Sequence, residues 1–104
     1  MGEKIQRLPG FRDFFPEDCA VRNYVFGKWR EISRLYGFHE YDGPILEPTD
    51  LYKKKSGDEI LGQLFHFDDR GERGVAMRPE LTPTLARMAA ARQRDYKKPL
   101  RWFG

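Results

Sequence analysis

A helical pattern bounded by Pro16 and Gly37 is the strongest constraint on how this chain folds. Pro16 suits the first turn of a helix, and two acids that follow it complement the helix dipole there. Apolar residues then recur at intervals of three and four, which is the spacing of one helix face; they are Val21, Val25, Trp29, Ile32 and Tyr36, flanked by Tyr24 and Leu35. Gly37 is typical of the left-handed residue that ends a helix. The pattern predicts one long helix whose apolar side is buried in a core.

The second half of the chain shows the alternation of apolar and polar residues that is typical of β-strands. Phe65 and Phe67 fall on one side of a predicted strand at residues 64–68, and residues 74–77 form a second strand after a polar turn. Two such segments with a short polar connection predict a β-hairpin. We therefore expect an α+β fold in which the long helix packs on an antiparallel sheet.

Residues 76–84 join the predicted hairpin to a second predicted helix. With a period of two residues, Arg78, Glu80 and Thr82 fall on one face of an extended segment. Thr82 is a predicted N-cap, and Pro83 suits the first helical position because its missing N–H costs nothing there. The polar row would end at a helix N-terminus, which favours an anion and could hold a small zwitterion such as an amino acid. An ordinary surface pair between Arg78 and Glu80 explains the same pattern.

The helix predicted from Pro83 has an apolar side and a basic side. The residues expected to be buried are Leu85, Met88, Ala89 and Tyr96, and those expected to point outward are Arg87, Arg92, Arg94, Lys97 and Lys98. The basic side has two explanations, which are solubility and contact with phosphate groups. The salt dependence of nucleic-acid binding would separate them.

The segment from Phe38 to Leu46 predicts a strand at the edge of a sheet. Proline cannot donate a backbone hydrogen bond to a neighbouring strand, so Pro44 belongs at an edge, a bulge or a strand start. An exposed edge is a template for pairing with a second copy of the chain. A plain turn between two short strands is the alternative, and both stay open at this point. A short helix is predicted at residues 51–55.

Composition limits the function classes. A chain of 104 residues is at most one domain, here residues 1–104, and its 34% of charged residues leaves a thin core. The net charge of +3 is compatible with nucleic acid but does not require it. The single cysteine, Cys19, excludes a disulfide within the chain and fits a reducing compartment, and no apolar run is long enough to span a membrane. We expect a cytoplasmic location.

Motifs for catalysis and metal binding are absent from the sequence. It contains no Walker A, GxGxxG or HExxH pattern. His39 and His66 have no cysteine or carboxylate partners at the spacing of metal ligands, and Cys19 has no evident base, so we expect a buried helical thiol. We therefore predict no catalytic residue and no metal ligand in this chain. Its contribution to any reaction would be to hold a substrate.

The order of these segments resembles the N-terminal part of the catalytic domain of class II aminoacyl-tRNA synthetases, and within that class the histidyl-tRNA synthetase family. The resemblance covers essentially all 104 residues. Its most specific parts are residues 37–47, which are similar to the family's motif 1, and residues 78–82, which read Arg-Pro-Glu-Leu-Thr and are similar to its histidine-binding loop.

The resemblance implies roles for individual residues. Glu80 and Thr82 would bind the α-amino group of histidine, and the backbone of Leu81 would line the site. In the family, motif 1 lies at a symmetric dimer interface, which implies interface roles for Gly37, Phe38, Glu40 and Pro44. The chain departs from the family pattern at Leu81, where many bacterial members have glycine, and at Gly43, where an apolar residue is more usual. Neither departure removes a polar contact.

The resemblance also implies that this chain is one part of a larger enzyme. Motif 2, motif 3, the histidine-specific segment and the anticodon-binding domain are not in the sequence, and a strand that has only begun at Trp102 and Phe103 is an unusual natural end. We expect an N-terminal fragment of a homodimeric ligase that uses ATP and Mg²⁺ to activate histidine and transfers it to tRNA(His). The fragment alone would not form the adenylate, because it lacks groups that stabilise the transferring phosphoryl group.

Two other functions are compatible with these residues. A synthetase-like regulatory subunit of ATP phosphoribosyltransferase shares the fold but does not charge tRNA, and the pair of Glu80 and Thr82 favours the ligase over it. A free-standing basic module for dimerisation or RNA binding is the third. RNA binding that does not respond to added salt would remove its electrostatic basis.

Overall fold

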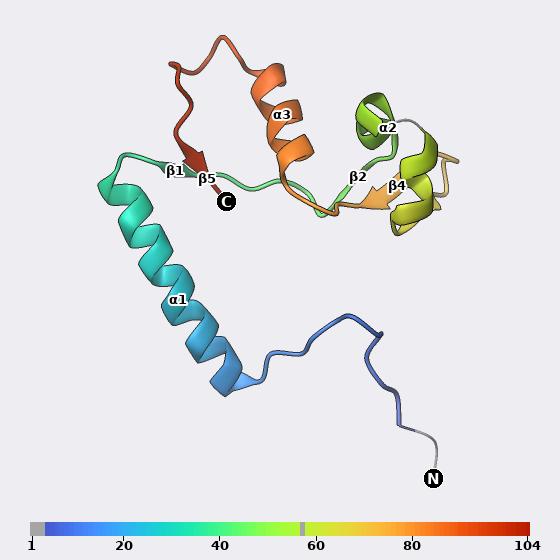
Figure 1. The fold of residues 1–104 in the computed structure, drawn as a ribbon, viewed down its shortest axis with the longest axis horizontal. Coiled ribbons are helices and arrows are strands. Elements are labelled where there is room, and N and C mark those ends of the chain that lie inside the picture. Colours follow the sequence, from blue (N-terminus) through green and yellow to red (C-terminus); the bar gives the residue numbers. More distant parts are fainter. Residues whose placement is uncertain (1–3, 57) are drawn as a thin grey trace. The chain divides into compact units, whose positions relative to one another are not determined.

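The computed structural model describes residues 4–56 and 58–104. Helices and short strands follow one another along the chain (Figure 1). In order they are α1 (Pro16–Leu35), β1 (His39–Glu40), β2 (Leu46–Pro48), α2 (Asp50–Ser56), the 3₁₀ helix η1 (Asp58–Gln63), β3 (His66–Asp68), β4 (Gly74–Met77), α3 (Thr82–Ala91) and β5 (Trp102–Phe103). The chain divides into two compact units, Met1–His39 and Glu40–Gly104, and each is described by itself. Helices together with an antiparallel sheet confirm the α+β class.

The first unit is built around α1, whose bounds follow the sequence signals. Pro16 occupies the first turn, where two acids follow it. At the other end Gly37 adopts the left-handed conformation with a φ of 77°, and the Phe38 N–H donates to the Ser33 carbonyl at 2.9 Å. This is the hydrogen-bond pattern of a glycine-terminated helix. The predicted helix and its stop signal are therefore confirmed.

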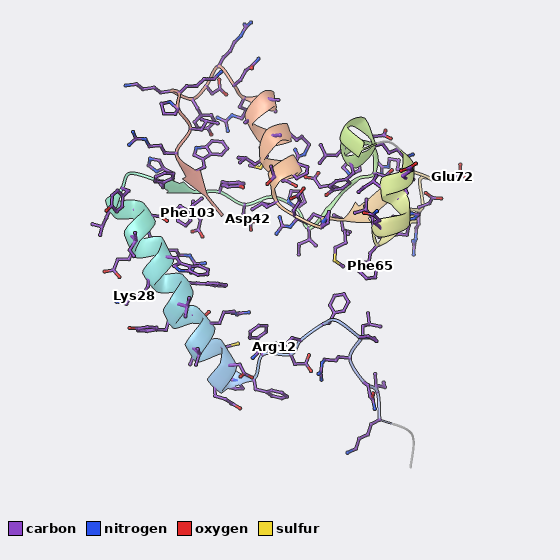
Figure 2. All side chains as sticks on the ribbon, viewed as in Figure 1. Arg12, Lys28, Asp42, Phe65, Glu72 and Phe103 are labelled. Atoms are coloured by element: carbon purple, nitrogen blue, oxygen red, sulfur yellow. The ribbon has the colours of Figure 1, made fainter. Side chains whose placement is uncertain are left out.

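The apolar stripe of α1 is not buried, and the prediction that it packs into a core is wrong. No residue of α1 is buried, and Trp29 and Leu35 leave 61% and 79% of their surface exposed. Side chains project from the helix on all sides (Figure 2). An amphipathic helix needs a second helix or a sheet to cover its apolar face. In residues 4–38 the structure has an irregular arm and α1 but no other helix or strand.

A three-stranded antiparallel sheet with the order β2-β4-β3 organises the second unit. β3 and β4 form the predicted hairpin, with Phe67 opposite Val75. β2 pairs with the other side of β4, with Glu47 opposite Ala76. Pro48 is tolerated because β2 is an outer strand of this sheet.

Residues 38–46 form less strand than the edge-strand prediction required. Only β1 lies in this range before β2 begins at Leu46, so the alternative, a connection between two short strands through Pro44, is the arrangement observed. β1 pairs with β5, and the Tyr41 N–H donates to the Phe103 carbonyl at 2.9 Å. β5 confirms the strand that was predicted at the C-terminal residues.

The hairpin turn is fastened by the Asp69 carboxylate. Its Oδ1 accepts hydrogen bonds from the Gly71 and Arg73 N–H groups at 2.8 and 2.9 Å, and its Oδ2 accepts one from Arg73 Nε at 3.0 Å. These donors, the Arg73 N–H first among them, hold the pKa of Asp69 below its usual value. The charge on Asp69 is therefore part of what closes the turn.

The core of the second unit lies where β2, β4, α2 and α3 meet. Ala76 and Thr84 are fully buried, whereas Glu47, Thr49 and Tyr52 keep 3%, 6% and 4% of their surface exposed. Four of these five side chains carry hydrogen-bonding groups. The core is small and largely polar, so hydrogen bonds contribute much to fixing the arrangement of its side chains.

The helices of the second unit agree with the sequence in part. α2 confirms the short predicted helix, and Leu85, Met88 and Ala89 are half-buried on α3, as expected for its inner side. Tyr96 was predicted to continue that side, but α3 ends at Ala91. The Tyr96 ring instead packs edge-on against Trp102, with 4.9 Å between the ring centroids.

Candidate functional site

The segment between β4 and α3 is an irregular connection, not the extended strand that the sequence predicted. β4 ends at Met77, and Pro79 has no N–H with which to continue the ladder. Arg78, Glu80 and Thr82 therefore do not share one face of a strand. The expectation that a strand holds these three side chains on rigid backbone is wrong.

Thr82 is the first residue of α3 and not its N-cap. Leu81 is the N-cap, and its carbonyl accepts a hydrogen bond from the Leu85 N–H at 3.0 Å. Pro83 lies in the first turn, as predicted. No side chain caps this helix. Its first N–H groups and the positive end of its dipole are thus available to an anionic group.

Arg78 fastens the start of the connecting segment to the chain before β2. Its N–H donates to the Ile45 carbonyl at 2.9 Å, and its guanidinium donates to the Gly43 and Pro44 carbonyls at 3.1 and 3.4 Å. The same guanidinium lies 3.9 Å from the Asp42 carboxylate. Arg78 is therefore held by these carbonyls. It does not form the ordinary surface pair with Glu80 that was the alternative explanation of the sequence pattern.

The three residues predicted to bind an amino acid follow this anchor. Glu80 and Thr82 are exposed, and Leu81 is half-buried. A carboxylate and a hydroxyl two residues apart, beside an uncapped helix start, offer partners to both the ammonium and the anionic end of a zwitterion. The geometry is thus compatible with the predicted binding of an amino acid, although these residues do not lie on one face of a strand.

Glu47 forms a buried polar network that the sequence analysis did not predict. The Thr84 hydroxyl donates to Glu47 Oε2 at 2.7 Å, and Arg87 Nε and Nη2 donate to the same oxygen at 3.2 and 3.0 Å. Arg87 is exposed, as expected, with 40% of its side chain accessible, and its guanidinium also pairs with the buried Glu47 carboxylate on β2. The sequence contained one indication of a role for Glu47, which is that it lies at the end of residues 37–47, the segment similar to motif 1.

Tyr52 places a buried hydroxyl among the charged residues around this segment. Its Oη has no hydrogen-bond partner among the described residues. Burial, followed by the Glu47 carboxylate, raises the pKa of Tyr52 above its ordinary 10.0; Arg78 acts in the opposite direction and Glu80 adds to the rise. The phenol is therefore held in its neutral form beside the candidate segment.

Tyr52→Phe is expected to raise the free energy of unfolding at neutral pH by about 1 kcal/mol, because it deletes an unpaired buried hydroxyl and keeps the ring. In the wild type the folded state keeps a proton that the unfolded chain releases above pH 10.0, so stability falls as pH rises past that value. The variant should lack this fall. Urea unfolding at pH 7 and at several higher pH values measures both effects.

Tyr24→Phe is the matched control for that experiment, because Tyr24 on α1 is 69% exposed. Its substitution should change neither the stability at neutral pH nor the pH dependence. A Tyr52→Phe protein that is less stable than the wild type at pH 7 would show that the hydroxyl has a partner.

The four residues predicted at a dimer interface fall in both units. Gly37 ends α1 and Phe38 follows it in the first unit, where Phe38 is 37% exposed. Glu40 lies in β1 and Pro44 in the connection to β2, both in the second unit. Their interface role stays a prediction.

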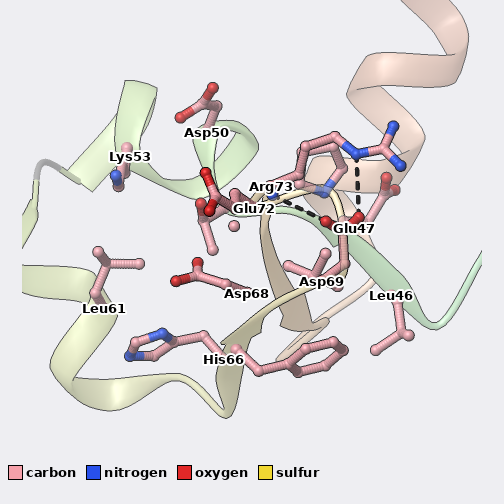
Figure 3. A pocket seen from close by; sticks show the side chains of 15 residues that line it. Leu46, Glu47, Asp50, Lys53, Leu61, His66, Asp68, Asp69, Glu72 and Arg73 are labelled. Carbon is pink, nitrogen blue, oxygen red and sulfur yellow. Dashed lines mark hydrogen bonds and ion pairs between the residues drawn. The ribbon is translucent and has the colours of Figure 1, made fainter.

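A pocket of about 990 Å³ opens beside β2, β3 and the start of α2 (Figure 3). Asp50, Asp68, Glu72 and His66 contribute to its wall. Residues 78–82 do not line it, so this hollow is separate from the candidate segment. Across residues 4–56 and 58–104, no group of three or more His, Cys, Asp or Glu side chains is arranged to hold a metal ion.

Cys19 is half-buried near the start of α1 and not fully buried as predicted. Its Sγ donates to the Phe14 carbonyl at 3.6 Å, and Arg22 Nη2 lies 3.9 Å from the sulfur. The thiol therefore contacts the arm before α1 and one residue of its own helix. These contacts give it no base that would activate it as a nucleophile.

Comparison with known proteins gives a sequence match to one family over most of the chain. The sequence model of the family described as histidyl-tRNA synthetase matches residues 10–103. The histidine–tRNA ligase of Opitutus terrae is 55% identical over 99 residues, which cover 95% of this chain and 23% of that protein. The chain therefore spans about a quarter of the length of this curated relative.

Solved structures give the same result for the fold. The apo histidyl-tRNA synthetase of S. aureus has a TM-score of 0.80 and 27% identity, over 93% of this chain and 23% of that chain. A Bacillus halodurans structure described as an ATP phosphoribosyltransferase regulatory subunit/histidyl-tRNA synthetase has a TM-score of 0.80 and 28% identity, over 98% of this chain and 27% of that chain. The description of the second structure names both a regulatory subunit and a histidyl-tRNA synthetase.

Proposed function

This chain belongs to the histidyl-tRNA synthetase family, and on that premise we propose that the whole protein is a histidine–tRNA ligase to which residues 1–104 contribute the N-terminal part of the catalytic domain. The ligase would activate histidine with ATP to histidyl-adenylate and transfer it to tRNA(His). The match of the family model over residues 10–103 is the observation that carries the proposal.

In this proposal Glu80, Leu81 and Thr82 bind the substrate histidine. The Glu80 carboxylate and the Thr82 hydroxyl would accept hydrogen bonds from the α-ammonium group, and the Leu81 backbone would line the site. Both side chains are exposed, and the segment is held by Arg78 before it and by α3 after it. A charge-assisted hydrogen bond of this kind contributes about 1.5–3 kcal/mol.

ATP and Mg²⁺ are assigned to the whole enzyme and not to this chain. Within the described residues, no group of three or more His, Cys, Asp or Glu side chains is arranged to hold a metal ion. Activation requires groups that stabilise charge on the transferring phosphoryl. This part alone is therefore expected to hold histidine without forming the adenylate.

The proposal includes a homodimer that uses the predicted motif 1 residues Gly37, Phe38, Glu40 and Pro44. The exposed apolar stripe of α1 supports an interface, because a large apolar surface of this kind is usually covered by a partner or by further chain. A cytoplasmic location completes the proposal and agrees with a single cysteine. Across the described residues, no helix is long and apolar enough to cross a membrane.

The regulatory-subunit alternative is less well supported than the ligase. The solved structure whose description mentions such a subunit is 28% identical to this chain, whereas the curated ligase of Opitutus terrae is 55% identical. The ligase is therefore the function that we propose.

The test is histidine-dependent exchange of pyrophosphate into ATP by the whole protein, followed by charging of tRNA(His). We expect exchange with histidine and none above background with the other standard amino acids. Absence of exchange, or equal exchange with another amino acid, would exclude the proposed ligase. Stimulation of an ATP phosphoribosyltransferase without charging would establish the alternative.

A further inference from the structure

Two sets of hydrogen bonds hold the candidate histidine segment against residues 43–47. Before the segment, the Arg78 guanidinium donates to the carbonyls of Gly43 and Pro44. After it, Thr84 and Arg87 donate to the Glu47 carboxylate. Glu80 and Thr82 remain exposed between these two anchors. The position of the segment is therefore set by β2 and the residues before it.

The second anchor is the buried carboxylate of Glu47, which accepts hydrogen bonds from two residues of α3. Glu47 is 3% exposed, and one of its oxygens accepts all three hydrogen bonds from α3. The Glu47 carboxylate is removed from water whereas the Arg87 side chain stays 40% exposed, so the cost of burying the carboxylate offsets part of the attraction between the two charges. Directional bonds to a buried carboxylate do select one arrangement of the groups around it. Here that arrangement is the placement of α3 on β2.

We propose that Glu47 is a positioning residue for histidine binding. By holding Thr84 and Arg87 it fixes the first two turns of α3, and with them the adjoining segment from Glu80 to Thr82. Thr84 lies two residues after Thr82 and is fully buried, so a shift of its contact with Glu47 moves the segment directly. This inference rests on the proposed function, because it assigns an effect on the histidine site.

The test compares variants at both ends of the Glu47 contact in the whole protein. Glu47→Gln keeps the side-chain volume and removes the charge that Arg87 requires. Thr84→Val removes the hydroxyl at nearly equal volume, and Thr84→Ser keeps it. The control is Arg92→Gln, which breaks the exposed 2.9 Å pair between Arg92 and Asp95 just after α3.

We expect Glu47→Gln and Thr84→Val to raise the KM for histidine by about tenfold, because a segment that samples several arrangements binds in proportion to its competent fraction. The KM for ATP, and kcat per titrated active site, should change by less than about twofold. Thr84→Ser and Arg92→Gln should keep the wild-type KM for histidine. A role in stability alone would reduce the number of active molecules and leave KM unchanged, and that outcome would overturn the proposal.

Amide hydrogen exchange gives a readout that does not depend on catalysis. In Glu47→Gln, exchange in residues 78–88 should rise about tenfold, whereas α1 should exchange as in the wild type. Unchanged exchange in residues 78–88 would also overturn the positioning role. A wild-type protein that activates no histidine would instead reject the proposed function, and the exchange result would still decide whether Glu47 fixes the segment.

Discussion

Replacing Glu80 with alanine is expected to lower kcat/KM for histidine activation by about 10- to 100-fold, which corresponds to the loss of one charge-assisted hydrogen bond to the ammonium group. Glu80 is exposed and lies outside β4 and α3. Its removal therefore breaks no buried contact, and the thermal midpoint of the protein should stay as in the wild type. Steady-state pyrophosphate exchange at varied histidine concentration measures the effect.

Two further variants separate charge from shape in that experiment. Glu80→Gln keeps the length of the side chain and should lose a large part of the same activity, because a neutral acceptor binds an ammonium group less strongly. Glu72→Gln is the matched control, since Glu72 is an exposed carboxylate in the turn at the far end of the same hairpin. Wild-type activity in Glu80→Ala would place the ammonium site elsewhere in the protein.

The elements that the sequence predicted well are those set by neighbouring residues. α1 runs between a proline signal and a glycine signal that act within one turn of the helix end, and Gly37 has the backbone conformation that its position predicted. The hairpin of β3 and β4 follows from alternation on both sides of a polar turn. In both cases the pattern of neighbouring residues was sufficient to predict the element.

Contacts between distant segments could not be predicted in the same way. Glu47 accepts hydrogen bonds from Thr84 and Arg87, which lie 37 and 40 residues further along the sequence. A pattern among neighbouring residues cannot predict a contact over such a distance in the sequence. Arg87 is exposed as predicted, but its ion pair with the buried Glu47 carboxylate was not predicted. The candidate residues 80–82 were identified from motif and spacing, but Pro79 and the helix start at Thr82 gave them an irregular backbone that alternation alone had missed.

Gly43→Ala is expected to destabilise the second unit by about 1–3 kcal/mol, because the added methyl group has no space. A Cβ at this position would overlap the Cγ2 methyl of Thr84 and lie 3.5 Å from the Met88 sulfur. Thr84 is fully buried, so its methyl group cannot swing into solvent. The alanine would push α3 away from residues 43–47 and strain the Glu47 contact. Equilibrium urea unfolding of the variant and the wild type measures the loss.

Thr84→Ser supplies the compensating change, because it deletes the methyl group in conflict and keeps the hydroxyl that donates to Glu47. Alone it should cost about 1 kcal/mol for the methyl group removed. In the double variant the alanine methyl fills that space, so the two losses should be less than additive. Gly27→Ala is the control, since a Cβ there meets no atom within 4 Å and should stabilise α1 by about 0.5–1 kcal/mol. Strict additivity of Gly43→Ala and Thr84→Ser would mean that Gly43 does not set the approach of α3 to the chain before β2.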